Sequence, residues 1–215
     1  MAGDNRGDRG QAFTLEGLLS AVVVMTALYL ALQAVIITPT TGGAVDPGVR
    51  EELQRQADDA LVVSAEAESG SLSELVRNWS QSRRTFAGAV NPRIGYGQRT
   101  PPGTLGAVMN ETFTQRGRQY NVEMRYLADA PGGATNTTTI VDRGEPSDSA
   151  VIATHRVTLY DNMTLTSPSA GPAELWQYDT NPTENPTDWQ SGYYPVPNVV
   201  DGPVYNIVEV RVIVW

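Results

Sequence analysis

The sequence predicts an α+β protein with a long N-terminal transmembrane helix, followed by a head of two to three helices packed on a small, mainly antiparallel β-sheet. Three observations lead to this fold class. An uncharged, largely apolar run of 21 residues extends from Gly17 to Ile37. Apolar residues then recur at helical spacing between residues 47 and 115, and the period changes to two beyond residue 120.

The apolar run is long enough to cross a bilayer, since 21 helical residues at ~1.5 Å per residue span about 30 Å. Pro39 and Gly42-Gly43 end the predicted helix. No small-residue cleavage site follows the run, which argues against a secretory signal removed after it. We expect a single-pass protein of the cell membrane, with a cytoplasmic N-terminus and residues 39–215 outside.

Three helices are predicted next. Asp46-Pro47 fits an N-cap and first helical residue, and opens an amphipathic helix over residues 47–67. The stretch SLSE at 71–74 fits a capping box and begins a short second helix. A third helix covers residues 104–115 and stops at Gly117.

Strands are predicted from alternating apolar residues at 120–126 and from the runs at 151–165 and 204–215. The last run is nearly continuous in apolar residues, which favours the centre of the sheet. Residues 128–148 are predicted to be a polar loop. Residues 166–203 hold several prolines and aromatic residues, and such a long loop is typical of surface function.

Composition narrows the classes of function. The net charge is −9, from 24 acidic and 15 basic residues, all of them arginine. The acidic excess argues against nucleic acid as a partner. An acidic, lysine-free chain resembles proteins of halophilic archaea, although a GC-rich genome that favours arginine codons is the alternative explanation. The absence of cysteine excludes disulfides, thiolate metal sites and thiol nucleophiles.

No catalytic constellation is predicted. His155 is the single histidine, and one histidine without cysteine does not make a zinc site. No Gly-x-Ser-x-Gly elbow is present for a serine nucleophile. We therefore expect no enzyme, no cofactor and no metal.

Two short motifs precede the apolar run: Arg9-Gly10-Gln11, and FTLEG from Phe13 to Gly17. FTLEG followed by an apolar helix resembles the N-terminus of type IV pilin-like proteins. Arg9-Gly10-Gln11 resembles the cleavage step of archaeal prepilins and archaellins. The resemblance covers about the first 37 residues.

The resemblance implies processing by a prepilin peptidase, a membrane aspartyl protease that cuts before the apolar helix. A cut between Gly10 and Gln11 would remove a leader, 1–10, and leave a filament-core helix, 11–38, with a head domain, 39–215. A cut between Ala12 and Phe13 is the alternative. Bacterial pilins carry an acid as the fifth mature residue, whereas Glu16 would be sixth or fourth.

Glu16 is expected to matter for assembly, together with Phe13. A lone carboxylate in an apolar environment costs several kcal/mol unless it is paired. The resemblance implies that Glu16 pairs with the α-amine that cleavage frees on a neighbouring subunit. The alternative is that Glu16 lies among lipid headgroups and has no role.

The resulting hypothesis is a pilin-like subunit, a minor pilin or pseudopilin, that assembles into a cell-surface filament. Its partners would be the membrane, the prepilin peptidase and other pilin-like subunits. The alternative is a non-assembling, membrane-anchored exported protein of the cell envelope.

Four Asn-x-Ser/Thr sequons are candidates for N-glycosylation, and we expect at least one to be modified. Asn136 is predicted to lie in a polar loop, which makes it the best acceptor. Asn78 stands beside Trp79 and is expected to be partly buried. The remaining candidates are Asn110 and Asn162.

Overall fold

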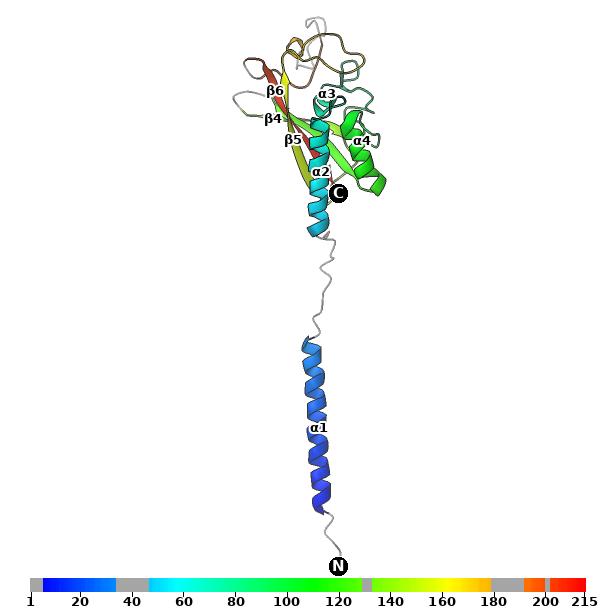
Figure 1. Ribbon diagram of the computed structural model, residues 1–215, viewed down its shortest axis with the longest axis vertical. Helices are drawn as coiled ribbons and strands as arrows, with labels where there is room; N and C mark the ends of the chain where they lie inside the picture. The colour runs from blue at the N-terminus through cyan, green and yellow to red at the C-terminus, as the bar shows by residue number, and fades with distance from the viewer. Residues whose placement is uncertain (1–5, 34–46, 129–132, 179–191, 200–201) are drawn as a thin grey trace, which may run out of the picture. The chain divides into compact units, whose positions relative to one another are not determined.

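A computed structural model of the chain describes residues 6–33, 47–128, 133–178, 192–199 and 202–215. The chain divides into two compact units, Met1–Ala44 and Val45–Trp215. The first unit contains one helix, α1, and the second contains the remaining helices and both sheets (Figure 1).

Helix α1 runs from Arg6 to Gln33. Among the described residues, no helix is both long and apolar enough to cross a membrane. The predicted transmembrane helix is therefore wrong, and so are the single-pass topology with a cytoplasmic N-terminus, the membrane localisation and the membrane anchor of the alternative hypothesis.

The difference comes from where the helix begins and ends. The prediction counted the apolar run as far as Ile37, but α1 stops at Gln33, and residues 34–46 lie outside the described residues. The 17 residues from Gly17 to Gln33 rise about 26 Å, less than the ~30 Å of a hydrocarbon core. At its other end α1 takes in the charged flank from Arg6 to Arg9.

The helices of the second unit are close to those predicted. They are α2 (Pro47–Ala65), α3 (Leu72–Val76) and α4 (Gly103–Thr112), which continues into the 3-10 turn η1 (Thr114–Arg116). The capping box is present in a modified form. The Ser71 hydroxyl accepts from the Glu74 N–H, whereas the Glu74 carboxylate accepts from the N–H of Gly70, one residue before the N-cap.

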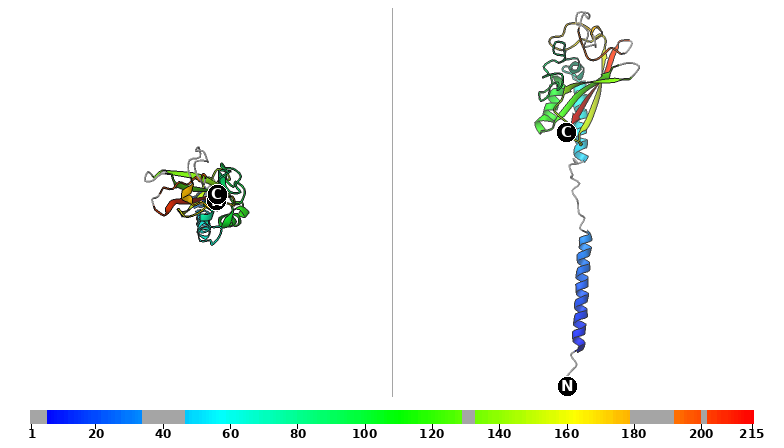
Figure 2. Two further views of the ribbon diagram at one scale, coloured as in Figure 1. Left: turned by 90° about the horizontal axis from the view of Figure 1, so that it is seen from above. Right: turned by 180° about the vertical axis from the view of Figure 1, so that it is seen from behind.

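The main sheet has four antiparallel strands in the order β4-β3-β6-β5, formed by Thr135–Val141, Tyr120–Leu127, Val204–Val214 and Val151–Tyr160. A separate hairpin pairs β1 (Trp79–Ser80) with β2 (Thr85–Phe86). Helix α2 packs against β5 and α4 packs against α2, so the helices lie on one side of the main sheet (Figure 2).

Strand β6 lies between β3 and β5, which confirms its predicted central place. Its apolar side chains at Val208, Val210 and Val212 are fully buried beneath the helices. The opposite face of the sheet carries charged side chains beside the exposed apolar side chains of Ile152 and Ile207. Glu209 on β6 stands between Arg125 on β3 and Arg156 on β5, both directly opposite it in register and each 3.8 Å away. One face of the sheet therefore holds the core and the other holds paired charges.

The sequence analysis missed one strand of the main sheet and both strands of the β1–β2 hairpin. Residues 135–141, predicted to be part of a polar loop, form the edge strand β4. Its alternation is weak because five of its seven residues are Thr or Asn, which tertiary pairing with β3 places in a strand. The predicted strand at 151–165 ends earlier, at Tyr160, where a turn begins.

The close approach of a loop to β4 depends on Gly95, which has a φ of +56°. The N–H of Tyr96 donates to the Ile140 carbonyl at 2.8 Å, bringing the two backbones together. A Cβ atom on Gly95 would overlap that same carbonyl group. Gly117, which ends η1, also has a positive φ of +74°, but a Cβ there would meet nothing within 4 Å.

We predict that Gly95→Ala lowers the free energy of unfolding by about 3 kcal/mol or more, since it combines left-handed strain with a backbone clash. The matched control Gly117→Ala is expected to cost only about 1–2 kcal/mol, the strain alone. Urea unfolding of the full-length chain, followed by tryptophan fluorescence, measures both. Equal losses for the two variants would contradict the close approach.

Candidate functional site

Between residues 17 and 29, where its side chains are described, the surface of α1 is largely apolar on all sides. Eight large apolar side chains between residues 18 and 29 are 55–73% exposed: Leu18, Leu19, Val22, Val23, Val24, Met25, Leu28 and Tyr29. Four of them are consecutive, so they point to all sides of the helix. Thr26 interrupts the run, but its hydroxyl donates to the Val22 carbonyl at 2.7 Å. We call residues 17–29 of α1 the apolar helix surface.

The predicted processing and assembly residues lie at the N-terminal side of this surface. Gly10, Gln11, Ala12 and Phe13 all fall within the backbone of α1, and their side chains lie outside what the structure describes. Glu16 is exposed and stands at the beginning of the apolar helix surface, before Gly17. It is the single carboxylate between residues 16 and 29, where the side chains of α1 are described.

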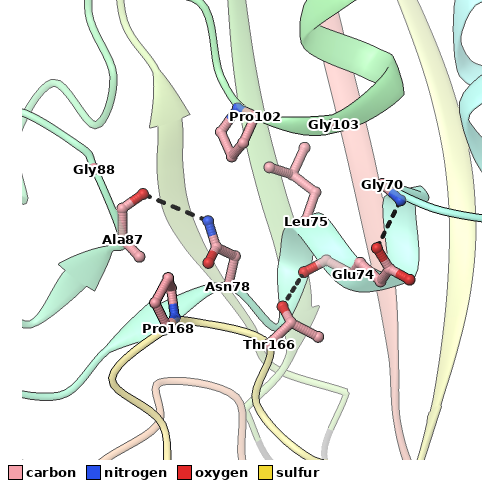
Figure 3. Close-up of a pocket in the computed structure, with 10 residues that line it drawn as sticks. All are labelled: Gly70, Glu74, Leu75, Asn78, Ala87, Gly88, Pro102, Gly103, Thr166 and Pro168. Carbon is pink, nitrogen blue, oxygen red and sulfur yellow. Dashed lines mark hydrogen bonds between the residues drawn. The ribbon is translucent and has the colours of Figure 1, made fainter.

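The second unit has a pocket of about 390 Å³ where α3, the start of α4 and the segment after β5 meet (Figure 3). Leu75 and Pro168 contribute apolar wall, and Glu74, Asn78 and Thr166 contribute polar groups. The Asn78 amide donates to the Tyr96 hydroxyl at 3.1 Å, and the Thr166 hydroxyl donates to the Glu74 carbonyl at 2.6 Å.

These polar groups already have partners within the fold. The Tyr96 hydroxyl donates in turn to the Ala87 carbonyl at 2.7 Å, which ties Asn78 to the loop after β2. A Glu74 carboxylate oxygen accepts from the Gly70 N–H at 2.6 Å. The pocket in Figure 3 is therefore a junction that joins α3 to neighbouring loops, and its polar contacts serve structure.

The four sequons fall in different surroundings. Asn78 is half-buried and its amide is engaged by Tyr96, as expected from its neighbour Trp79. Asn110 lies in α4 and is half-buried. Asn162 is exposed in the turn after β5. Asn136 is also exposed, but it lies in β4, opposite Tyr126, and not in the predicted loop.

No metal centre is formed in the part of the chain that the structure describes. No group of three or more His, Asp or Glu side chains is placed to hold a metal ion among those residues. His155 lies in β5 opposite Val210 and is half-buried.

Two buried polar atoms of the described residues have no hydrogen-bond partner, the Ser73 hydroxyl and the Trp79 indole nitrogen.

The geometry thus defines a class of protein: an apolar helix joined in sequence to an α+β unit whose helices cover one face of an antiparallel sheet. The chain belongs to the family described as "Family of unknown function (DUF7288)", which matches residues 9–214. The match includes residues of both units, so the apolar helix is part of the family pattern. No curated protein and no solved structure matches the chain.

The hydrogen bonds of the Tyr96 hydroxyl, with the Asn78 amide and the Ala87 carbonyl, affect the stability of the fold at alkaline pH. Burial raises the pKa of Tyr96 to about 12, although the hydrogen bond from Asn78 opposes the shift. In the unfolded chain the same phenol ionises near pH 10. Between pH 10 and pH 12 the unfolded state therefore binds fewer protons than the folded state, and stability falls as the pH rises.

We predict that the contribution of Tyr96 is fully present below about pH 10 and is lost as the pH approaches 12. Tyr96→Phe removes this titration, so the difference in unfolding free energy between the wild type and the variant should shrink over that interval. Urea unfolding at several pH values between 8 and 12 measures it. A constant difference across that range would show that Tyr96 does not titrate as its burial requires.

Proposed function

We propose that this protein is a pilin-like subunit that assembles with copies of itself into a filament through α1. The observation that carries the proposal is the apolar helix surface, which presents large apolar side chains on all sides. Such a helix has no polar face to turn toward water, and helices of this kind are normally buried against other apolar surfaces. The proposed occupant of that surface is α1 of neighbouring copies.

The energetics favour association. Burying a Val, Leu or Met side chain contributes about 1.5–3 kcal/mol each. Seven such exposed residues on one helix would supply about 10–21 kcal/mol if fully buried, which is comparable to or larger than an association cost of roughly 4–15 kcal/mol.

Glu16 would set the register between copies. Cleavage between Gly10 and Gln11 frees an α-amine five residues before Glu16. In a helix this separation corresponds to about 7.5 Å along the axis. Neighbouring copies offset by that distance would bring one amine level with the next carboxylate, and the pair would neutralise both charges. A cut between Ala12 and Phe13 would reduce the offset to about 4.5 Å.

The membership of residues 9–214 in one family supports the proposal, because the family pattern keeps the helix and the α+β unit together. The proposal requires processing by a prepilin-type peptidase.

N-terminal sequencing of the protein from its native host tests processing. We expect the mature chain to begin at Gln11, or at Phe13 if the alternative cut is used. A chain that begins at Met1 or Ala2 would contradict processing and with it the proposed amine–Glu16 pair.

The role of Glu16 is tested by assembly. Glu16→Ala is expected to remove the processed subunit almost completely from filaments pelleted at high speed and viewed by electron microscopy, because the freed amine would lose its partner. Glu51→Ala changes an exposed carboxylate of α2 and is the matched control, expected to assemble normally. Normal assembly of Glu16→Ala would remove Glu16 from the mechanism.

A further inference from the structure

A second pocket, of about 410 Å³, lies at the end of the main sheet where the β1–β2 hairpin faces the edge strand β4. Its size falls within the range of small-molecule sites. Three aromatic side chains line it, from Trp79, Tyr126 and Tyr193, and three consecutive threonines line it from β4, at Thr137–Thr139. We call it the Thr–Tyr pocket.

The aromatic wall of the Thr–Tyr pocket is held in place from two sides. Trp79 meets Tyr193 edge to face, with ring centroids 6.0 Å apart. The Tyr193 N–H donates to the Gln81 side chain at 2.9 Å, which fixes that ring beside the hairpin turn. The Tyr126 hydroxyl shares a 3.2 Å hydrogen bond with the Thr138 hydroxyl. The pocket is therefore formed before any ligand binds.

Arg84 is the feature that distinguishes this pocket. It is the one lining residue, among those the structure describes, that carries a formal charge, in a chain whose net charge is −9. Its guanidinium lies 5.9 Å from the centre of the Tyr193 ring. Its backbone is left-handed, with a φ of +48°, a conformation that glycine adopts at lower cost. A strained residue of this kind is a reason to look for function at its side chain.

We propose that the Thr–Tyr pocket binds a saccharide that carries a carboxylate, such as a hexuronic acid. The rings of Tyr126 and Tyr193 would contact the C–H faces of the sugar, and the Thr138 hydroxyl, which lies on the same face of the sheet as Tyr126, would pair with one of its hydroxyls. Arg84 would hold the carboxylate by charge-assisted hydrogen bonds. A nucleotide matches the pocket less well than a uronic acid, because its phosphates carry more negative charge than Arg84, the single cation among the described lining residues, would balance.

Two sources would supply the pocket with such a sugar. One is a free saccharide or a glycan on a neighbouring molecule. The other is a glycan on the chain's own Asn136, because the exposed side chain of this sequon lines the same pocket. In both cases the acidic sugar ring and its contacts are the same, and neither source depends on filament assembly.

Calorimetric titration of the full-length chain, produced in a host without N-glycosylation, tests the site with glucuronate and with glucose as probes. We expect glucuronate to bind and glucose to bind at least about tenfold more weakly. Arg84→Gln should weaken glucuronate binding by about tenfold or more and make it equal to glucose binding. The matched control is Arg83→Gln, an exposed neighbour that donates to the Val90 carbonyl and does not line the pocket; it should bind as the wild type.

Protein from the native host separates the two sources. If the Asn136 glycan occupies the pocket, that protein should not take up added glucuronate, whereas the unglycosylated protein should; if the ligand is free, both proteins should bind glucuronate alike. Three results would each overturn the proposal. They are no binding of glucuronate to the unglycosylated protein, equal effects of Arg83→Gln and Arg84→Gln on binding, and preferential binding of a glutamate-rich peptide. Far-UV circular dichroism confirms that every variant is folded.

Discussion

The second unit depends on the pairing of β6 with β3 on one side and β5 on the other. The strands β3 and β5 are not neighbours, so β6 is the element that makes one sheet of them. The same strand supplies the valines on which α2 packs, and it carries Glu209, which holds arginines of both neighbours on the opposite face. Core packing, sheet continuity and the charge pairs all require this strand to be in register.

The segment at residues 192–199 is attached to α3 and to β6 by side-chain hydrogen bonds and by one backbone bond, from the Val199 N–H to the Tyr205 carbonyl. The Tyr194 hydroxyl donates to the Val76 carbonyl at 2.9 Å, and the Tyr205 hydroxyl donates to the Val196 carbonyl at 2.6 Å. Asn206, fully buried in β6, donates to the Pro197 carbonyl at 2.8 Å. The buried Tyr194 and Tyr205, whose hydroxyls are both hydrogen-bonded, thus hold this segment in place. Tyr193, next to Tyr194 in the chain, is thereby positioned at the Thr–Tyr pocket.

Much of the fold could be predicted because local chemistry and tertiary packing agree. The helix at Pro47, the cap at Ser71 and the central place of β6 all follow from residue type and spacing. The strand β4 could not be predicted, because its threonines and asparagines have no apolar alternation and gain their conformation from β3. The Thr–Tyr pocket was missed for the same reason, since Arg84, Asn136 and Tyr193 meet only once β4 is in place. The transmembrane prediction counted the apolar run as far as Ile37, whereas no helix of the described residues is long and apolar enough to cross a membrane.

The position of β6 as the last strand in chain order has a consequence for synthesis. On the ribosome, β3, β4 and β5 emerge first, and the edges of β3 and β5 that β6 will join stay unpaired until it follows. Contacts between β3 and β6 link residues about 90 positions apart, as in Tyr120 and Val214, and such non-local pairing slows folding. During that delay the exposed apolar side chains of α1, which precedes the second unit in the chain, are already available to other chains.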